Sequence, residues 1–371
     1  MTRIESIETI PLRVPLKHLY KGSYYKMRNR CTIVTTIKTD DGLTGRAYNA
    51  DSDEEQDEIL AIIHDELVPA VVGMDLLSTE RIWEAMLPST FDQLRDRRLT
   101  MQAIACIDTA VWDGVGQLLG QPLWKLWGGY RSSIPMIGIG GYYGSSEADT
   151  EKDMAFFSEQ YGMVGMKFKI GGKPPEEDVA RLTFARTFVD DDFLFVVDAN
   201  QGYTVEEALA FIRLLPDDVT LRWFEEPTRW HMDNRGLADV RNRGNVRVAA
   251  GQSEVSRVGM RQMIASQSID VCNFDASWGG GPTEWRRIAA MALAYDVELG
   301  HHEEGHLSSH LLASVPNGTF TESFSPMRDP IFWELITNRK PLENGHLILP
   351  EAPGLGWELD EDFIDKYRVD R

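Results

Sequence analysis

The sequence predicts an α/β fold in which a (β/α) barrel is joined to a smaller α+β domain. After residue 131, short apolar strands alternate with amphipathic helices, a pattern typical of a parallel sheet covered by helices. Seven such units and a shorter last strand in about 200 residues fit a closed barrel better than an open sheet. The nucleotide-binding patterns GxGxxG and GxxxxGK[ST] are missing where an open nucleotide-binding sheet would carry them.

Residues 1–130 are expected to form the α+β domain. Apolar and polar residues alternate in 4–14 and again in 31–48, where Asp41-Gly42 predicts a hairpin turn. The polar, aromatic and basic stretch between them, 17–30, is expected to be a mobile loop. From about 54 to 127 the apolar spacing is helical, so a small antiparallel sheet should precede helices.

Residues 131–325 are expected to form the barrel, and residues 326–371 a segment that packs back on the first domain. The strand-like segments are 134–143, 165–172, 193–202, 222–228, 246–254, 270–281, 297–305 and 318–324. Each of the first seven precedes a helix-like segment. The tail leaves this alternation and contains a hairpin-like turn in 342–350.

Composition limits the classes of partner and the compartment. The formal net charge of -20 disfavours nucleic acid and anionic membranes, which need a basic face, and leaves small molecules as expected partners. No apolar run approaches the roughly 20 residues of a membrane span, and the N-terminus does not resemble a signal peptide. Cys31, Cys106 and Cys272 are interpreted as buried, reduced thiols of a cytoplasmic protein.

Ionisable residues end successive barrel strands, where barrel enzymes place their catalytic groups. They are separated by 20 to 29 residues, the step of one βα unit, and are Lys169, Asp198, Glu225, Glu254, Asp275, His302 and Glu322. One charged strand end is common, whereas seven in succession are hard to explain as solvated surface. The set therefore predicts an active site.

The residue types suggest metal-assisted acid–base chemistry. Asp198, Glu225 and Glu254 or its neighbour would form a cluster of three acids, whose hard oxygens suit Mg²⁺, with Mn²⁺ as a substitute. Lys167 and Lys169 are two apart on one strand and so face the same side. Close like charges lower each other's pKa, which would leave one lysine able to act as a base.

A second base is expected across the site from the lysines. Asp275 and His302 end adjacent strands, and an aspartate beside a histidine orients the ring and raises its basicity. Bases on both faces of a substrate suit either stereochemical inversion or acid-assisted loss of a β-hydroxyl. The residues His301, Glu303, Glu304 and His306 crowd near His302, and a second metal site there is a weaker alternative.

These motifs resemble the mandelate racemase branch of the enolase superfamily over nearly the whole chain. The resemblance is carried by the helix 107–129 and by KFK, VVDAN, FEEP, FDASWGGG, LGHHEEGHLSSHLL and TFTES. It implies a modified TIM barrel of the (β/α)7β type with a capping domain, a bound Mg²⁺, a carboxylate substrate and a homo-oligomer, dimeric or larger.

The resemblance also implies roles for individual residues. Lys169 would be the base on one face, and Lys167 its neighbour that lowers its pKa and contacts the substrate carboxylate. Asp198 and Glu225 would be the first two metal ligands, and Asp275 with His302 the dyad on the other face. Glu322 would hydrogen-bond the substrate carboxylate, and Asn200 would be a polar active-site residue.

The third metal ligand departs from the family pattern. The family has Gly-Glu at the end of the fifth strand, whereas this chain has Gly251-Gln252-Ser253-Glu254. Simple register gives the position to Gln252. Because Gln252 and Glu254 are two apart and would share a strand face, Glu254 is favoured as the better anionic ligand.

Substrate contacts are expected from two loops. In the capping loop, which sets specificity in the resembled family, Tyr24, Lys26 and Arg28 are candidates, with ordinary surface roles as the alternative. Trp278 is a candidate wall of the pocket, with core packing as the alternative. A cationic capping loop mildly favours a polyhydroxylated anion as substrate.

The expected reaction is abstraction of the proton alpha to a carboxylate, through an enediolate. A lyase that dehydrates an aldonate or aldarate to a 2-keto-3-deoxy acid is the first hypothesis. A racemase, epimerase or cycloisomerase acting on a 2-hydroxy acid or a sugar-acid lactone could use the same residues. A barrel that binds an acid without catalysis is a third alternative, supported only by Gln252.

Overall fold

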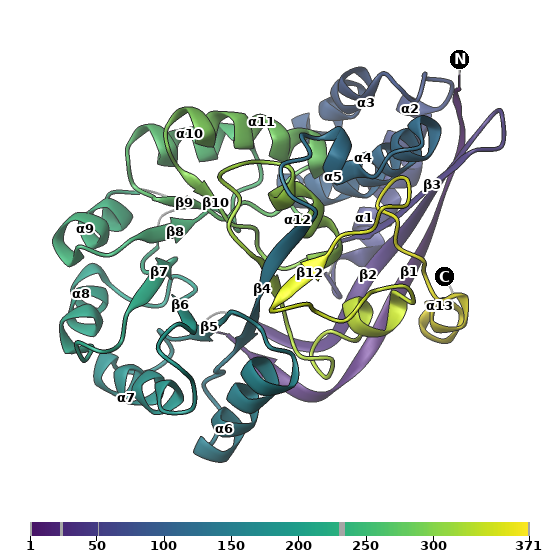
Figure 1. Cartoon of the computed structure of the whole chain (residues 1–371). Helices are drawn as coiled ribbons and strands as arrows, with labels where there is room; N and C mark the ends of the chain where they lie inside the picture. The colour runs from purple at the N-terminus through teal and green to yellow at the C-terminus, as the bar shows by residue number, and fades with distance from the viewer. Residues whose placement is uncertain (1, 23–24, 51, 230–233, 370–371) are drawn as a thin grey trace.

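The computed structural model describes residues 2–22, 25–50, 52–229 and 234–369. An antiparallel sheet with its own helices lies beside a curled parallel sheet whose helices cover its outer face (Figure 1). This arrangement confirms the predicted barrel with an α+β capping domain. No helix of the described ranges is long and apolar enough to cross a membrane.

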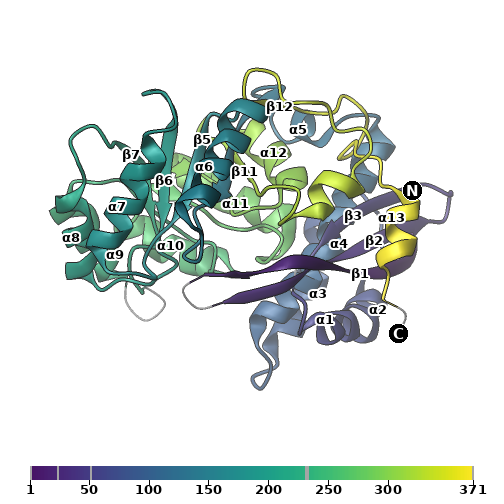
Figure 2. The same cartoon turned by 90° about the horizontal axis from the view of Figure 1, so that it is seen from below.

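The capping sheet contains a longer hairpin than the sequence pattern predicts. β1 (Ile4–Lys21) pairs with β2 (Lys26–Thr39) in antiparallel register as far as Lys21 opposite Lys26, so the expected mobile loop over 17–30 is wrong. Cross-strand backbone bonds continue beyond the apolar alternation, past a register shift between Pro15 and Tyr20. Figure 2 shows this hairpin reaching from the capping domain towards the barrel.

The rest of the capping domain follows the predicted pattern. β2 turns into β3 (Thr44–Asn49) around Gly42, whose φ of 85° suits glycine. The helical segments that follow are α1 (Gln56–Ile62), η1 (Ile63–Leu67), α2 (Val68–Val71), α3 (Thr79–Met86), η2 (Leu87–Phe91), α4 (Arg97–Leu119) and α5 (Leu123–Leu126). The long buried helix α4 ends at Gly120, which is left-handed, as the break before Pro122 indicates.

Parallel strands alternate with helices through the barrel. The strands are β4 (Ser133–Gly140), β5 (Gly165–Lys169), β6 (Leu194–Asp198), β7 (Leu221–Glu225), β8 (Val248–Ala250), β9 (Val271–Cys272), β10 (Glu298–Leu299) and β11 (Thr321–Ser323). The helical segments between them are α6 (Glu147–Ala155), η3 (Phe156–Gln160), α7 (Pro175–Arg186), α8 (Val205–Leu214), α9 (Arg235–Gly244), α10 (Arg257–Ala265), α11 (Gly281–Ala294) and α12 (Gly305–Ala313).

The sheet closes on itself, and its interior is packed. β4 pairs with both β5 and β11, and Leu299 of β10 exchanges backbone bonds with Asn317 and Thr319 just before β11. Inside, Trp223 stacks on Phe320 with ring centroids 4.6 Å apart, among Ile137, Val196, Ala249 and Val271. Because side chains fill the barrel, a ligand must enter at the ends of the strands.

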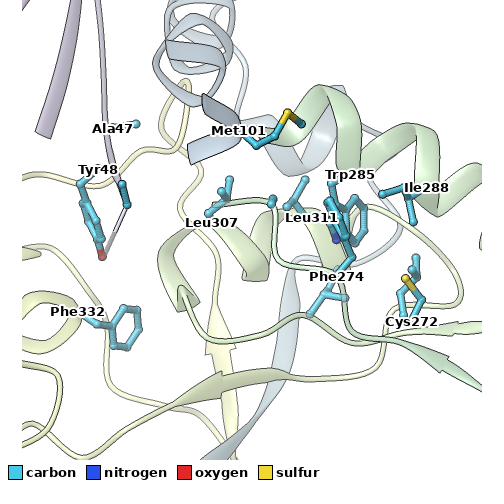
Figure 3. Packing of buried hydrophobic residues seen from close by; sticks show 14 of the residues in the cluster. Ala47, Tyr48, Met101, Cys272, Phe274, Trp285, Ile288, Leu307, Leu311 and Phe332 are labelled. Atoms are coloured by element: carbon cyan, nitrogen blue, oxygen red, sulfur yellow. The ribbon is translucent and has the colours of Figure 1, made fainter. Parts of the chain in front are cut away.

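The capping domain and the barrel share one hydrophobic core. Figure 3 shows Met101 of α4 near Trp285 and Ile288 of α11 and near Leu307 and Leu311 of α12, all buried. The aliphatic and aromatic contact between these helices fixes the position of the cap over the barrel.

The C-terminal segment contacts both parts of the molecule. Its elements are η4 (Ile331–Leu335), β12 (His346–Ile348) and α13 (Glu361–Tyr367). β12 pairs antiparallel with barrel strand β4, whereas α13 packs on β1 and Val369 donates its N–H to Pro11 of the capping sheet. The segment therefore joins the cap to the barrel.

Candidate active site

The two lysines of β5 lie inside a cluster of carboxylates at the carboxyl end of the barrel. Lys167 Nζ lies 2.9 Å from Glu225 Oε1 and 2.7 Å from Glu322 Oε2. Lys169 Nζ lies 2.6 Å from Asp198 Oδ2 and 3.1 Å from Asn200 Oδ1. β5, β6, β7 and β11 thus deliver five of the expected side chains to one buried site.

The protonation expected for the lysines is not what this site shows. Burial alone would lower the pKa of Lys167, but Glu225 and Glu322 outweigh it and raise that pKa. Burial also opposes the charge of Lys169, and Asp198 outweighs it in the same way. The predicted lowering of one lysine's pKa by the other is outweighed in this structure, because each ammonium lies within 2.9 Å of a carboxylate.

The oxygen donors of the site fit a divalent cation. Asp198 and Glu225 are direct partners across β6 and β7, and both are fully buried. Burial is the largest influence on Glu225 and raises its pKa. The amide oxygen of Gln252 is buried and has no hydrogen-bond partner among the described residues, while its nitrogen donates to Glu226 Oε2 at 3.2 Å. Two carboxylates and a free amide oxygen form a donor set that suits Mg²⁺.

The expected third acid, Glu254, is not part of this donor set. β8 ends at Ala250, and residues 251–254 turn, with the Glu254 N–H donated to Gly251. Gln252 and Glu254 therefore do not share a strand face, and the Glu254 carboxylate lies against Gly259 of α10. The prediction of a cluster of three acids is wrong: the described residues contain no such group of three His, Cys, Asp or Glu side chains.

The predicted dyad of Asp275 and His302 is present. His302 Nδ1 lies 2.9 Å from Asp275 Oδ2, and the other carboxylate oxygen accepts the N–H groups of Ser277 and Trp278. These backbone bonds fix the aspartate, which in turn fixes the ring. His302 follows β10, and in the closed sheet β10 is separated from β5 by at least two strands on either side.

Glu303 contacts the second ring nitrogen of His302, Nε2. Its Oε1 lies 3.1 Å from His302 Nε2, and its Oε2 lies 3.6 Å from Arg30 of the cap. Burial would lower the pKa of His302, but Glu303 and Asp275 raise it well above its usual value. Each ring nitrogen thus lies beside a carboxylate, an arrangement that favours the imidazolium, which can donate a proton.

The neighbourhood of His302 does not form a second metal site. His301 Nε2 accepts the Ala276 N–H at 3.0 Å, and its Nδ1 faces the carbonyl of His302. Glu304 pairs with Arg30 at 2.9 Å and with His306 at 3.3 Å. Among the described side chains no metal-binding cluster of His and Glu is formed, so this alternative is wrong.

A cavity of about 1200 Å³ opens above these groups. Lys26 and Arg28 line it from the capping hairpin and are exposed. Trp278 lines it from the barrel, with its ring centroid 4.9 Å from that of His302. Tyr24 lies outside the described residues. The cavity thus combines reactive groups from the barrel with polar contacts from the cap.

Three further residues of the cavity were missed as site residues by the sequence analysis. Glu226 follows Glu225, and strand alternation would turn it outward, but its φ of 38° bends the chain after β7 and brings it to Gln252. Glu303 was considered only as part of a second metal site. Arg328 lies in the tail beyond the last strand, where the βα repeat gives no signal.

Family models match both parts of the chain. Residues 6–128 match the mandelate racemase / muconate lactonizing enzyme N-terminal domain. Residues 150–363 match the model described as enolase C-terminal domain-like. The two matches span the capping domain and the barrel.

Individual relatives extend this likeness. The chain is 31% identical to an arabinonate dehydratase of Saccharolobus solfataricus, over 91% of this chain and 90% of the relative. It is 29% identical to a 3,6-anhydro-alpha-L-galactonate cycloisomerase of Streptomyces coelicolor, over 99% of each chain. A mandelate racemase/muconate lactonizing enzyme from a marine actinobacterium, solved in complex with magnesium, is 50% identical with a TM-score of 0.94 over 100% of both chains. The chain belongs to the mandelate racemase / muconate lactonizing enzyme family of the enolase superfamily.

Proposed function

We propose that this protein is a Mg²⁺-dependent hydro-lyase that dehydrates an acid sugar to a 2-keto-3-deoxy acid. The observation that carries the proposal is that Lys169 and His302, the latter bonded to Asp275, line one cavity from well-separated strands. Asp198 and Glu225 are buried beside Lys169. A dehydratase needs a base at the α-carbon and an acid at the β-hydroxyl, and Lys169 and His302 can serve both needs.

Asp198, Glu225 and the Gln252 amide oxygen would hold the metal ion. Bound Mg²⁺ would supply positive charge beside the substrate carboxylate and so stabilise the enediolate. Lys167 lies between Glu225 and Glu322 and would contact the same carboxylate. One buried oxygen of Glu322 has no hydrogen-bond partner among the described residues, which leaves this side chain available to the substrate carboxylate.

The reaction requires two proton transfers. Lys169, whose pKa Asp198 raises in this structure, must first release its own proton. The neutral amine would then take the proton from the α-carbon, whose electron pair moves into the enediolate. His302, as imidazolium, would donate a proton to the β-hydroxyl, which leaves as water while the C–O bond breaks. The enol that remains becomes a 2-keto-3-deoxy acid when it takes up a proton at C3. Glu303 must leave His302 Nε2 before that nitrogen can reach a substrate.

A second candidate is a cycloisomerase or racemase. The same opposed groups could remove a proton on one face and return one on the other, and a relative named as a cycloisomerase covers 99% of the chain. The enediolate is common to both reactions, so only the fate of the β-substituent separates them.

A substrate screen tests the proposal. The Mg²⁺-loaded protein is incubated with a library of aldonates and aldarates, and proton NMR follows the signals of the C2 and C3 protons. A dehydratase gives the paired signals of a C3 methylene group beside a ketone, and one such product supports the proposal. Conversion of a substrate to an epimer or a ring isomer, without loss of water, would replace it by the second candidate.

We also expect a homo-oligomer. Phe91 is 67% exposed and Leu94 is 99% exposed in the segment between α3 and α4. Exposed apolar side chains close together favour a protein–protein contact. Light scattering of the purified protein tests this expectation, and the mass of a single chain at micromolar concentration would contradict it.

A further inference from the structure

Arg328 is a buried guanidinium at the edge of the active-site cavity. It lies in the connection between β11 and η4 and is only 2% exposed. Its guanidinium carbon is 4.2 Å from the ring centroid of Phe324 and 5.2 Å from that of Tyr20. Together with Lys169 and His302 it lines the same cavity. The two aromatic rings hold the guanidinium in place.

The hydrogen-bonding capacity of this side chain is not met by the protein. Nε and Nη1 of Arg328 are buried and have no hydrogen-bond partner among the described residues. A buried cation without such partners costs several kcal/mol unless a counter-charge meets it. An anionic ligand that accepts hydrogen bonds from Nε and Nη1 would therefore stabilise the guanidinium.

The nearby carboxylates already have other partners. Glu303 pairs with His302 at 3.1 Å. Glu304 and Asp329 pair with Arg30 at 2.9 and 3.1 Å. Glu303 influences Arg328 electrostatically, but no ion pair between described side chains reaches that guanidinium. Glu304 and Asp329 thus pair with Arg30, and Glu303 pairs with His302, rather than with Arg328.

Arg328 lies within electrostatic range of the reacting groups. Lys169 and Arg328 both act to lower the pKa of the Tyr142 phenol, which burial raises, and its hydroxyl has no hydrogen-bond partner among the described residues. Tyr25, which lines the cavity, likewise interacts with both cations. Because Lys169 and Arg328 line one cavity of about 1200 Å³, an elongated ligand whose reacting carbon lies at Lys169 can extend to Arg328.

We propose that Arg328 binds a second carboxylate at the far end of the substrate, so that the substrate is a dicarboxylic acid sugar rather than a monocarboxylic one. The inference rests on the proposed function and adds the substrate class. A carboxylate is favoured over a hydroxyl because a guanidinium pairs with it through charge-assisted, directional bonds, which also remove the burden of an unpaired buried charge.

The test uses pairs of acid sugars that differ only at C6, such as galactarate with galactonate and glucarate with gluconate. The Mg²⁺-loaded wild type should turn over the dicarboxylate of a pair at the higher kcat/KM. Arg328→Gln should raise KM for the dicarboxylate roughly tenfold to a hundredfold, the worth of a charge-assisted hydrogen bond, and leave the monocarboxylate within about threefold. Arg328→Lys, which keeps the charge, should fall between wild type and Arg328→Gln.

Arg339→Gln is the matched control. This arginine lies in the same C-terminal segment, with its guanidinium carbon 4.2 Å from the ring centroid of Trp333. Its Nε is also buried without a partner among the described residues, but it does not line the cavity. Arg339→Gln should leave the ratio of kcat/KM for the dicarboxylate to kcat/KM for the monocarboxylate unchanged. Thermal unfolding of each variant shows whether it folds, and Arg328→Lys carries the test if Arg328→Gln does not.

The outcomes separate the substrate class from the reaction. A wild type that prefers monocarboxylates, or an Arg328→Gln variant that weakens both members of a pair equally, would overturn the inference while dehydration stands. If no acid sugar reacts, the proposed function fails, and calorimetric binding decides the inference. Tighter binding of galactarate than of galactonate, lost in Arg328→Lys or Arg328→Gln, then supports it, and equal binding overturns it.

Discussion

At the scale of single residues, the donor set of the metal site depends on a glutamine. Gln252 uses its amide nitrogen for Glu226 and leaves its oxygen free, so it can act as a neutral ligand beside Asp198 and Glu225. The charge that a third acid would bring is instead provided nearby by Glu226. An amide oxygen binds Mg²⁺ less strongly than a carboxylate oxygen, because the attraction between full charges is missing.

Replacement of Gln252 by Glu should therefore strengthen metal binding. We expect the Kd for Mg²⁺, measured by isothermal titration calorimetry, to fall roughly tenfold in Gln252→Glu, since a carboxylate replaces an amide in a buried site. Glu254→Gln is the control and should leave the Kd unchanged, because the Glu254 carboxylate lies against Gly259. A larger effect at Glu254 than at Gln252 would contradict this assignment.

At the scale of elements, the strands show which parts of the site a sequence can predict. Lys169, Asp198 and Glu225 are the last residues of β5, β6 and β7, so strand periodicity and the barrel rule suffice to place them together. Beyond a strand end these rules are less dependable: they succeed for Asp275 and His302, which follow β9 and β10, and fail for Glu254 and Glu226. Glu254 follows a turn at residues 251–254, so its side chain does not lie on the same side as that of Gln252. Glu226 lines the cavity because its positive φ bends the chain after β7.

Longer connections were still less predictable. The hairpin between β1 and β2 extends by backbone pairing through polar residues, which carry no apolar alternation to reveal it. The position of Arg328 at the cavity depends on the path of the C-terminal segment over the barrel, which only the tertiary fold determines. Family resemblance assigned no role to either Glu303 or Arg328.

The contact between α4 and α11 carries a pH-dependent prediction. Asp108 of α4 accepts the Thr283 N–H at 2.8 Å and its hydroxyl at 2.7 Å, in the first turn of α11. Burial raises the pKa of Asp108 from its ordinary 3.8 to about 7. The folded state therefore binds the proton of Asp108 more tightly than the unfolded state does. The stability that this proton contributes is complete below a pH of about 4 and is lost as the pH rises through about 7.

Asp108→Asn removes the titration and keeps the shape. Relative to wild type, the variant should gain about 3 kcal/mol of stability between pH 5 and pH 8, because about two pKa units of the titration lie in this range at 1.36 kcal/mol each. Urea unfolding of both proteins at the two pH values measures this difference. A difference in unfolding free energy that is the same at both pH values would show that the carboxyl does not titrate in this range.

At the scale of the whole molecule, a buried arginine ties the cap to the barrel. Arg30 of β2 is 1% exposed and pairs with Glu304 after β10 and with Asp329 of the C-terminal segment. It also faces Glu303, which contacts the active-site histidine. The position of the capping hairpin over the cavity and the environment of His302 are thus coupled through one guanidinium.

Loss of that guanidinium should destabilise the whole fold. Arg30→Met leaves buried carboxylates without their counter-charge, and we expect a loss of about 3 to 5 kcal/mol in the free energy of unfolding. Lys38→Met is the control, because Lys38 and Glu8 form an exposed pair and should contribute less than about 1 kcal/mol. Equal effects of the two substitutions in urea unfolding would show that the cap is held mainly by its apolar core.

Lys169 is expected to remove the α-proton while His302 assists departure of the β-hydroxyl, and hydrogen exchange in D₂O tests this division of roles most directly. Proton NMR follows the α-proton of an acid sugar and its dehydration product with Mg²⁺-loaded wild type, Lys169→Met and His302→Asn. We expect wild type to remove the α-proton and to form the product. Lys169→Met should leave the α-proton in place, whereas His302→Asn should still exchange it but form little product. An α-proton that stays in place with wild type, or that Lys169→Met removes at the wild-type rate, would contradict this assignment.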